Sequence, residues 1–126
     1  MTVEILCVGT ELLLGNIVNT NAAYLAEKCA SLGLSCYYQS VVGDNEGRLK
    51  EAISTAIGRS DVVILSGGLG PTEDDLTKET AAAVMGKELV MDEDSKDAIA
   101  AYFKKRGCKK SPERKKAIKM LTEASV

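Results

Sequence analysis

The sequence predicts an α/β sandwich with a mostly parallel sheet, and three observations support that fold class. Strand-like and helix-like segments alternate along the chain and are joined by short links. Residues 61–66 contain four apolar residues in a row, which is typical of a parallel strand covered by helices on both faces. The 126 residues are 45% hydrophobic and 27% charged, so residues 1–126 suit a single domain with a modest core.

The first half of the chain predicts two strands and two helices. Residues 3–8 form an apolar run that Gly9 stops, and residues 34–42 are β-branched and aromatic. Apolar residues at helical spacing predict a helix over 20–32. A second helix follows, and Asp44 is the expected N-cap.

The second half continues the alternation after the strand at 61–66. A glycine-rich loop precedes a helix expected from about Asp74 to Met85. Residues 89–91 suggest a short strand, and Asp92 would cap a helix with Ile99, Tyr102 and Phe103 on its apolar face. The run Ser111-Pro112-Glu113 has the cap, proline and acid of a helix start.

The composition excludes several kinds of chemistry. The chain has no histidine, so Ser-His-Asp triads, Cys-His pairs and histidine zinc sites are ruled out. Its four cysteines form no Cys-x-x-Cys motif and are expected to be reduced thiols in a cytoplasmic protein: Cys7, Cys29, Cys36 and Cys108. No apolar run suits a membrane helix and no secretory signal is visible, so no membrane partner is expected.

The charge is unevenly distributed along the chain. The net charge is −2, but residues 104–126 carry 9 basic and 2 acidic side chains. A basic segment can bind nucleic acid, yet aromatic residues are not interleaved with these lysines and arginines. We therefore expect these residues to form a solvated helix face, and we expect no nucleic-acid partner. Some of the lysines could still contact phosphates or an acidic neighbouring subunit.

Two strand ends carry unusual loops and should meet at one edge of the sheet, where open α/β sheets bind ligands. The first strand ends in Gly9-Thr10-Glu11, and the third runs into Ser66-Gly67-Gly68-Leu69-Gly70. Glycines let backbone amides approach a phosphate closely, and the loop leads into a helix N-terminus. The spacing fits neither a Walker loop nor a dinucleotide fingerprint, and a plain strand-to-helix turn is the alternative.

The acidic run Glu73-Asp74-Asp75 follows the glycine loop and has two interpretations. Thr72 and Asp75 resemble a capping box, and acids suit the first turn of a helix. Alternatively, the carboxylates hold Mg²⁺, which phosphate oxygens would bridge. Glu11 could join that metal site or be a solvated loop acid.

Two other groups of polar and aromatic residues follow the strands. Residues 19–21 (Asn-Thr-Asn) are all good helix caps, and those that do not cap are free to contact a base or ribose. Tyr37 and Tyr38 lie in a predicted strand, and at least one of them is expected to pack in the core.

Three motifs resemble the N-terminal domain of the competence/damage-inducible protein CinA family. They are the runs from Gly9 to Asn21, from Val42 to Asn45 and from Ser66 to Thr77. The domain type also occurs in molybdopterin-binding proteins of molybdenum cofactor synthesis. The resemblance therefore implies a three-layer α/β/α sandwich with a mostly parallel sheet.

The resemblance also implies a nucleotide site. Such CinA-like domains act as metal-dependent ADP-ribose pyrophosphatases, so we expect a small-molecule nucleotide partner and a divalent metal, most simply Mg²⁺. Asp75 and Asp74 are the expected catalytic residues, and Asp75, Asp74 and Glu11 the expected metal ligands. The expected nucleotide- and phosphate-binding residues are Gly9, Thr10, Asn19, Asn21, Ser66, Gly67, Gly68, Leu69, Gly70 and Thr77.

Two other functions stay open alongside hydrolysis. One is a module that binds molybdopterin or a nucleotide without turnover, and the other is adenylyl transfer to molybdopterin. A homo-oligomer, dimer or trimer, is expected. The family domain usually continues into a further strand and loop, and its second, amidase-type domain is absent here, so residues 1–126 are expected to be a truncated domain.

Overall fold

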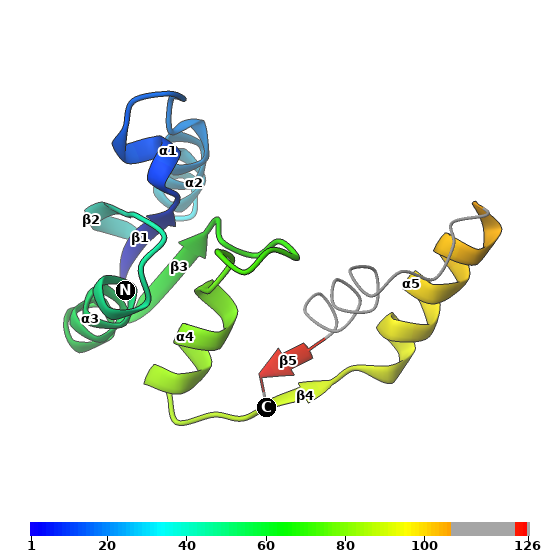
Figure 1. The fold of residues 1–126 in the computed structure, drawn as a ribbon. Helices are drawn as coiled ribbons and strands as arrows, with labels where there is room; N and C mark the ends of the chain where they lie inside the picture. Colours follow the sequence, from blue (N-terminus) through cyan, green and yellow to red (C-terminus); the bar gives the residue numbers. More distant parts are fainter. Residues whose placement is uncertain (107–122, 126) are drawn as a thin grey trace.

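The computed structural model describes residues 1–106 and 123–125, and Figure 1 shows their arrangement. The elements in chain order are β1 (Thr2–Val8), α1 (Thr10–Leu13), α2 (Thr20–Ser31), β2 (Ser35–Val42), α3 (Glu46–Arg59), β3 (Val62–Ser66), α4 (Thr77–Val84), β4 (Leu89–Met91), α5 (Glu93–Lys105) and β5 (Glu123–Ser125). The predicted alternation of strands and helices is therefore confirmed for the described residues.

The main sheet has three parallel strands in the order β2-β1-β3. Ile5 in the central strand is opposite Gln39 of β2 and Ile64 of β3. β1 is buried from Val3 onward, whereas β3 is half-buried and begins at the exposed Val62. The prediction that residues 61–66 are buried on both faces was wrong, because Val62 is exposed and the other residues of β3 are only half-buried.

Helices cover both faces of β1, which confirms the three-layer α/β/α sandwich. Leu6 and Val8 pack with Leu49 and Ile53 of α3, and α4 adds Val84 to this cluster. On the opposite face, a second cluster joins Ile5 and Cys7 of β1 to Ala22 of α2. The period of two along a strand sends alternate side chains to the two helical layers, so one strand supports both cores.

Two predicted helix starts were wrong by one and by three residues. Asn45, not Asp44, caps α3 by accepting a hydrogen bond from the Arg48 N–H at 3.0 Å. Asp44 instead accepts from the Thr10 N–H, while its own N–H donates to Thr10 Oγ1. This reciprocal pair ties the end of β2 to the end of β1. The helix predicted from Asp74 begins at Thr77.

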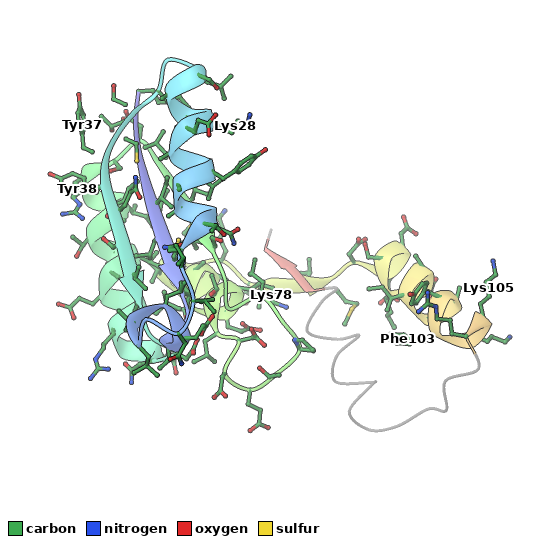
Figure 2. The ribbon with its side chains drawn as sticks, turned by 90° about the horizontal axis from the view of Figure 1, so that it is seen from above. Lys28, Tyr37, Tyr38, Lys78, Phe103 and Lys105 are labelled. Carbon is green, nitrogen blue, oxygen red and sulfur yellow. The ribbon has the colours of Figure 1, made fainter. Side chains whose placement is uncertain are left out.

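The two adjacent tyrosines of β2 are both exposed, so the prediction of a core role for one of them was wrong. Figure 2 shows Tyr37 and Tyr38 on the outer side of the strand. The Arg59 guanidinium lies 3.7 Å from the centre of the Tyr38 ring. The favourable contact of a cation with an aromatic face accounts for Tyr38 at this position.

The segment after α4 extends away from the sheet (Figure 1). β4, predicted at 89–91, pairs antiparallel with β5. On α5, Ile99 and Phe103 are half-buried, but Tyr102 is exposed. The predicted helix start at Ser111, most of the basic segment and Cys108 lie outside the described residues.

Two properties of the described residues concern the environment of the protein. Cys7, Cys29 and Cys36 are free thiols, as predicted; Cys7 and Cys29 are buried, whereas Cys36, which its apolar strand predicts to be buried, is half-buried. None of the described helices has the length and apolar character needed to cross a membrane. The cytoplasmic location stays a prediction.

Candidate functional site

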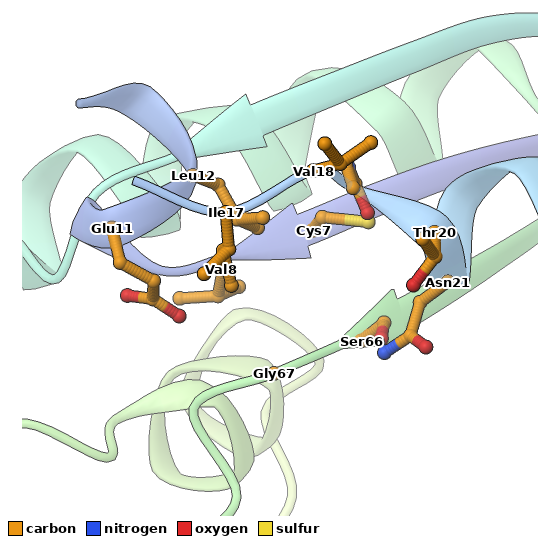
Figure 3. Close-up of a pocket in the computed structure, with 11 residues that line it drawn as sticks. Cys7, Val8, Glu11, Leu12, Ile17, Val18, Thr20, Asn21, Ser66 and Gly67 are labelled. Carbon is orange, nitrogen blue, oxygen red and sulfur yellow. Dashed lines mark hydrogen bonds between the residues drawn. The ribbon is translucent and has the colours of Figure 1, made fainter. Parts of the chain in front are cut away.

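A pocket of about 130 Å³ lies at the carboxyl ends of β1 and β3, at the sheet edge that the sequence indicates. The first turn of α2 and the loop before it form one wall, and the end of β3 forms another (Figure 3). Its lining residues are Cys7, Val8, Glu11, Leu12, Ile17, Val18, Asn19, Thr20, Asn21, Ser66 and Gly67. A concave site with apolar walls and a few polar groups is typical of small-molecule binding.

The polar groups of the pocket come from the start of α2 and the end of β3. Asn19 is the N-cap of α2, since its Oδ1 accepts from the Ala22 N–H at 3.2 Å. Asn21 points its amide at the next strand, where Nδ2 donates to Ser66 Oγ at 3.3 Å. Asn19 therefore caps the helix and Asn21 bridges to the sheet, and a contact from Asn21 to a nucleotide stays a prediction.

The glycine loop after β3 is held by tight packing. Gly67 has a φ of +93°, and a Cβ there would lie 2.1 Å from the carbonyl oxygen of Val8. Gly68 has a φ of +63°, and its Cβ would lie 2.2 Å from Thr77 Oγ1. The buried Thr77 hydroxyl donates to the Gly67 carbonyl at 2.7 Å. Packing and backbone conformation thus require these two glycines and Thr77, and phosphate binding by the loop stays a prediction.

Asp75 closes the turn between the glycine loop and α4. Its Oδ2 accepts from the Thr72 N–H at 3.0 Å and from the Thr72 hydroxyl at 2.5 Å. The hydroxyl bond is the main reason that the pKa of Asp75 lies below its ordinary value, and backbone N–H groups of Gly70 and Thr72 lower it further against an opposing effect of burial. The capping-box interpretation is close to this geometry, but the motif closes a turn, not the first turn of a helix.

The described residues do not assemble the predicted metal site. No group of three or more His, Cys, Asp or Glu side chains is placed to hold a metal ion in residues 1–106 and 123–125. Asp74 is exposed, Asp75 is occupied by Thr72, and Glu11 alone of the three lines the pocket. Since Mg²⁺ needs near-octahedral oxygen ligation, this arrangement of the described residues does not fit a metal centre, and magnesium binding stays a prediction.

The structure therefore brings together part of the predicted binding set. The predicted residues that line the pocket are Glu11, Asn19, Asn21, Ser66 and Gly67. Those that do not line it are Gly9, Thr10, Gly68, Leu69, Gly70, Asp74, Asp75 and Thr77. Thr10 is engaged with Asp44, and Leu69 is exposed.

The apolar part of the pocket was not predicted from the sequence. Cys7 at the end of β1 and Ile17 and Val18 in the loop before α2 line it. Ile17 and Val18 are 53% and 83% exposed, which marks a surface not buried by the fold itself. Two adjacent apolar residues in a loop between a glycine and a helix cap are the signal that could have found this wall.

Comparison with known proteins agrees with this geometry. The family described as "Probable molybdopterin binding domain" matches residues 4–124. A competence-damage inducible protein of Alkaliphilus oremlandii is 63% identical over 107 residues, which are 85% of this chain and 26% of that protein. A relative of the same name in Caldicellulosiruptor saccharolyticus is 53% identical over the whole chain. The chain spans about 30% of the length of that second relative.

Two solved structures share the fold. The protein CinA of Thermoplasma acidophilum, described as of unknown function, has 37% identity and a TM-score of 0.79, covering 98% of this chain and 70% of that one. The molybdopterin biosynthesis enzyme MoaB of Thermus thermophilus has a TM-score of 0.66 at 20% identity, covering 99% of this chain and 74% of that one. At that identity, the likeness to MoaB is one of fold.

Proposed function

This chain belongs to the molybdopterin-binding domain family, and from that premise we propose that the pocket between β1, β3 and α2 binds molybdopterin. The observation that carries the proposal is a pocket at the carboxyl ends of two parallel strands, in a chain that matches this family over residues 4–124. Ligands of open α/β sheets bind at that edge.

The chemistry of the pocket suits a flat heterocycle with polar edges. Val8, Leu12 and Ile17 offer apolar surface to a ring, while Asn21 and Ser66 offer an amide and a hydroxyl. Among the described residues, no three carboxylates are placed to hold the metal ion that the predicted hydrolysis needs, and Glu11 is the one carboxylate of the pocket lining. Binding without turnover, the alternative expected from the sequence, is therefore favoured over ADP-ribose hydrolysis. The names of the relatives given for this chain do not mention that hydrolysis.

The proposal is tested by titrating the protein with molybdopterin under anaerobic conditions and following pterin fluorescence. Asn21→Ala removes the amide that bridges α2 to Ser66, and we expect a loss of affinity of about two- to tenfold for this one hydrogen-bonding group. Asn16→Ala, in the loop before α2 and outside the pocket lining, is the control for the same chemical change and should bind like the wild type. No binding by the wild-type protein would reject the proposal.

The other activities are tested on the same preparation. AMP release from ADP-ribose that requires Mg²⁺ would restore hydrolysis as the leading function. Adenylylated molybdopterin formed from ATP and molybdopterin would show transfer beyond binding. Light scattering coupled to size-exclusion chromatography tests the predicted dimer or trimer.

A further inference from the structure

Glu11 contributes a carboxylate to the pocket that has no partner in the described part of the chain. It lies on the four-residue helix α1, directly after β1, and lines the pocket. Its side chain makes no hydrogen bond or ion pair with any residue of 1–106 or 123–125. An ionised carboxylate has two oxygens that only accept hydrogen bonds. One end of the pocket therefore presents a pair of unused acceptors.

Gly9 fixes where this carboxylate lies. A Cβ at residue 9 would be 2.5 Å from Glu11 Oε1 and 2.9 Å from Oε2, so the carboxylate folds back over the glycine. Gly9 itself is anchored, because its N–H donates to the Val42 carbonyl at 2.9 Å. Any larger residue at this position would push the carboxylate away.

The two ends of the pocket differ in hydrogen-bonding character. Figure 3 shows Glu11 at one side and Asn21 at the other, with the apolar Val8 and Ile17 between them. The Asn21 amide and Ser66 hydroxyl at the far side are hydrogen-bonded to each other. A ligand that fills the pocket must therefore present donors toward Glu11 and an apolar face to the middle.

We propose that Glu11 is a specificity-determining residue that accepts the two parallel N–H donors of a 2-amino-4-oxopyrimidine edge; this rests on the proposed function. A pterin ring carries that edge as its N3–H and 2-amino group, and guanine carries the same pair. Adenine presents one donor beside a ring nitrogen acceptor, whose lone pair would face a carboxylate oxygen. Two parallel charge-assisted bonds bind and select the first class.

Accepting two donors is a role that a single carboxylate can perform without other acids nearby. As a metal ligand, Glu11 would need further oxygens nearby, and no such group occurs among residues 1–106 and 123–125. As an acceptor for paired donors, it needs only its own two oxygens and a wall that holds the ring. Gly9 leaves room for the carboxylate to face the pocket, and the apolar lining residues form the wall that would hold the ring.

The test measures selectivity with three fluorescent or calorimetric titrations: 6-hydroxymethylpterin, guanosine and adenosine. Glu11→Gln replaces one acceptor with an N–H₂ donor, and we expect pterin and guanosine affinity to fall at least about tenfold while that for adenosine does not fall. Gly9→Ala keeps the charge but displaces the carboxylate, so it should weaken pterin binding in the same direction. Glu27→Gln makes the same chemical change on the exposed side of α2 and should change nothing.

The outcomes separate this inference from the proposed function. If Asn21→Ala weakens pterin binding but Glu11→Gln does not, the pocket binds pterin and the role of Glu11 is rejected. If the wild type binds molybdopterin but not hydroxymethylpterin or guanosine, the ring edge is not recognised and the inference also fails. If no pterin binds to the wild type, both fail. If the wild type binds pterin but not guanosine, and Glu11→Gln abolishes the pterin binding, the result would support the edge contact and assign the site to pterins.

Discussion

The buried ion pair between Glu4 and Arg59 allows a quantitative prediction about stability. Glu4 lies in the central strand and is 1% exposed. It accepts from Arg59 Nε at 3.0 Å and Nη2 at 2.7 Å, and from the Ser60 hydroxyl at 3.2 Å. The hydrogen bond from Arg59 is the chief reason that the pKa of Glu4 lies below its ordinary value, and burial opposes it.

We expect Glu4→Gln to lower the free energy of unfolding by about 2 kcal/mol at pH 7. Hydrogen bonds to charged groups contribute about 1.5–3 kcal/mol each, but the glutamine oxygen can keep one of them. The Arg59 side chain is 38% exposed, so water screens part of the charge and the lower end of the range applies. Arg59→Met should cost more, because it leaves a buried carboxylate unpaired.

The pH dependence of the free energy of unfolding follows from the lowered pKa of Glu4. A carboxyl group whose pKa is lower in the folded state stabilises the fold above its ordinary pKa of 4.5, and this stabilisation is lost as the pH falls through the folded value. The gap in unfolding free energy between wild type and Glu4→Gln should therefore be constant from pH 7 to about 5 and shrink below.

Urea denaturation followed by circular dichroism at a series of pH values measures that gap. Glu51→Gln, an identical change at an exposed position of α3, is the control and should stay within about 0.5 kcal/mol of the wild type. A gap below about 0.5 kcal/mol at pH 7, or one that does not change between pH 7 and pH 3, would refute the reasoning.

Two further predictions concern the loop after β3. Gly67→Ala should destabilise the protein by more than about 2 kcal/mol in urea denaturation, because its Cβ meets the Val8 carbonyl and its φ is +93°; Gly58→Ala, in a helix with open space, should stabilise it by up to about 1 kcal/mol. Asp75→Asn should lower the hydrogen-exchange protection of residues 70–77, measured relative to the intrinsic rate at each pH, and acidification below pH 3.8 should do the same in the wild type, since the carboxylate form accepts from Thr72. Equal exchange rates in both proteins would contradict that role.

The sequence predicted the three parallel strands and the binding edge because both depend on short-range patterns. Apolar runs mark strands wherever they lie, and the carboxyl ends of parallel strands meet at one edge of the sheet. The sequence could not predict that Asn45, and not Asp44, caps α3. Both residues are good caps, and the choice depends on Thr10, which is 34 residues away in sequence and hydrogen-bonded to Asp44 in the fold.

The run from Ser66 to Thr77 shows why residue types alone do not locate a site. Glycines beside acids suggest phosphate and metal, yet here Gly67 is required by the Val8 carbonyl, and Asp75 by Thr72. These contacts lie within the fold, and they require the same residue types at the same spacing as a phosphate or metal site would. Glu11 is the reverse case, a single acid in a short helix that reads as a solvated residue. A carboxylate that lines a pocket, and has no partner among residues 1–106 and 123–125, is a stronger indication of a ligand than acids already engaged within the fold.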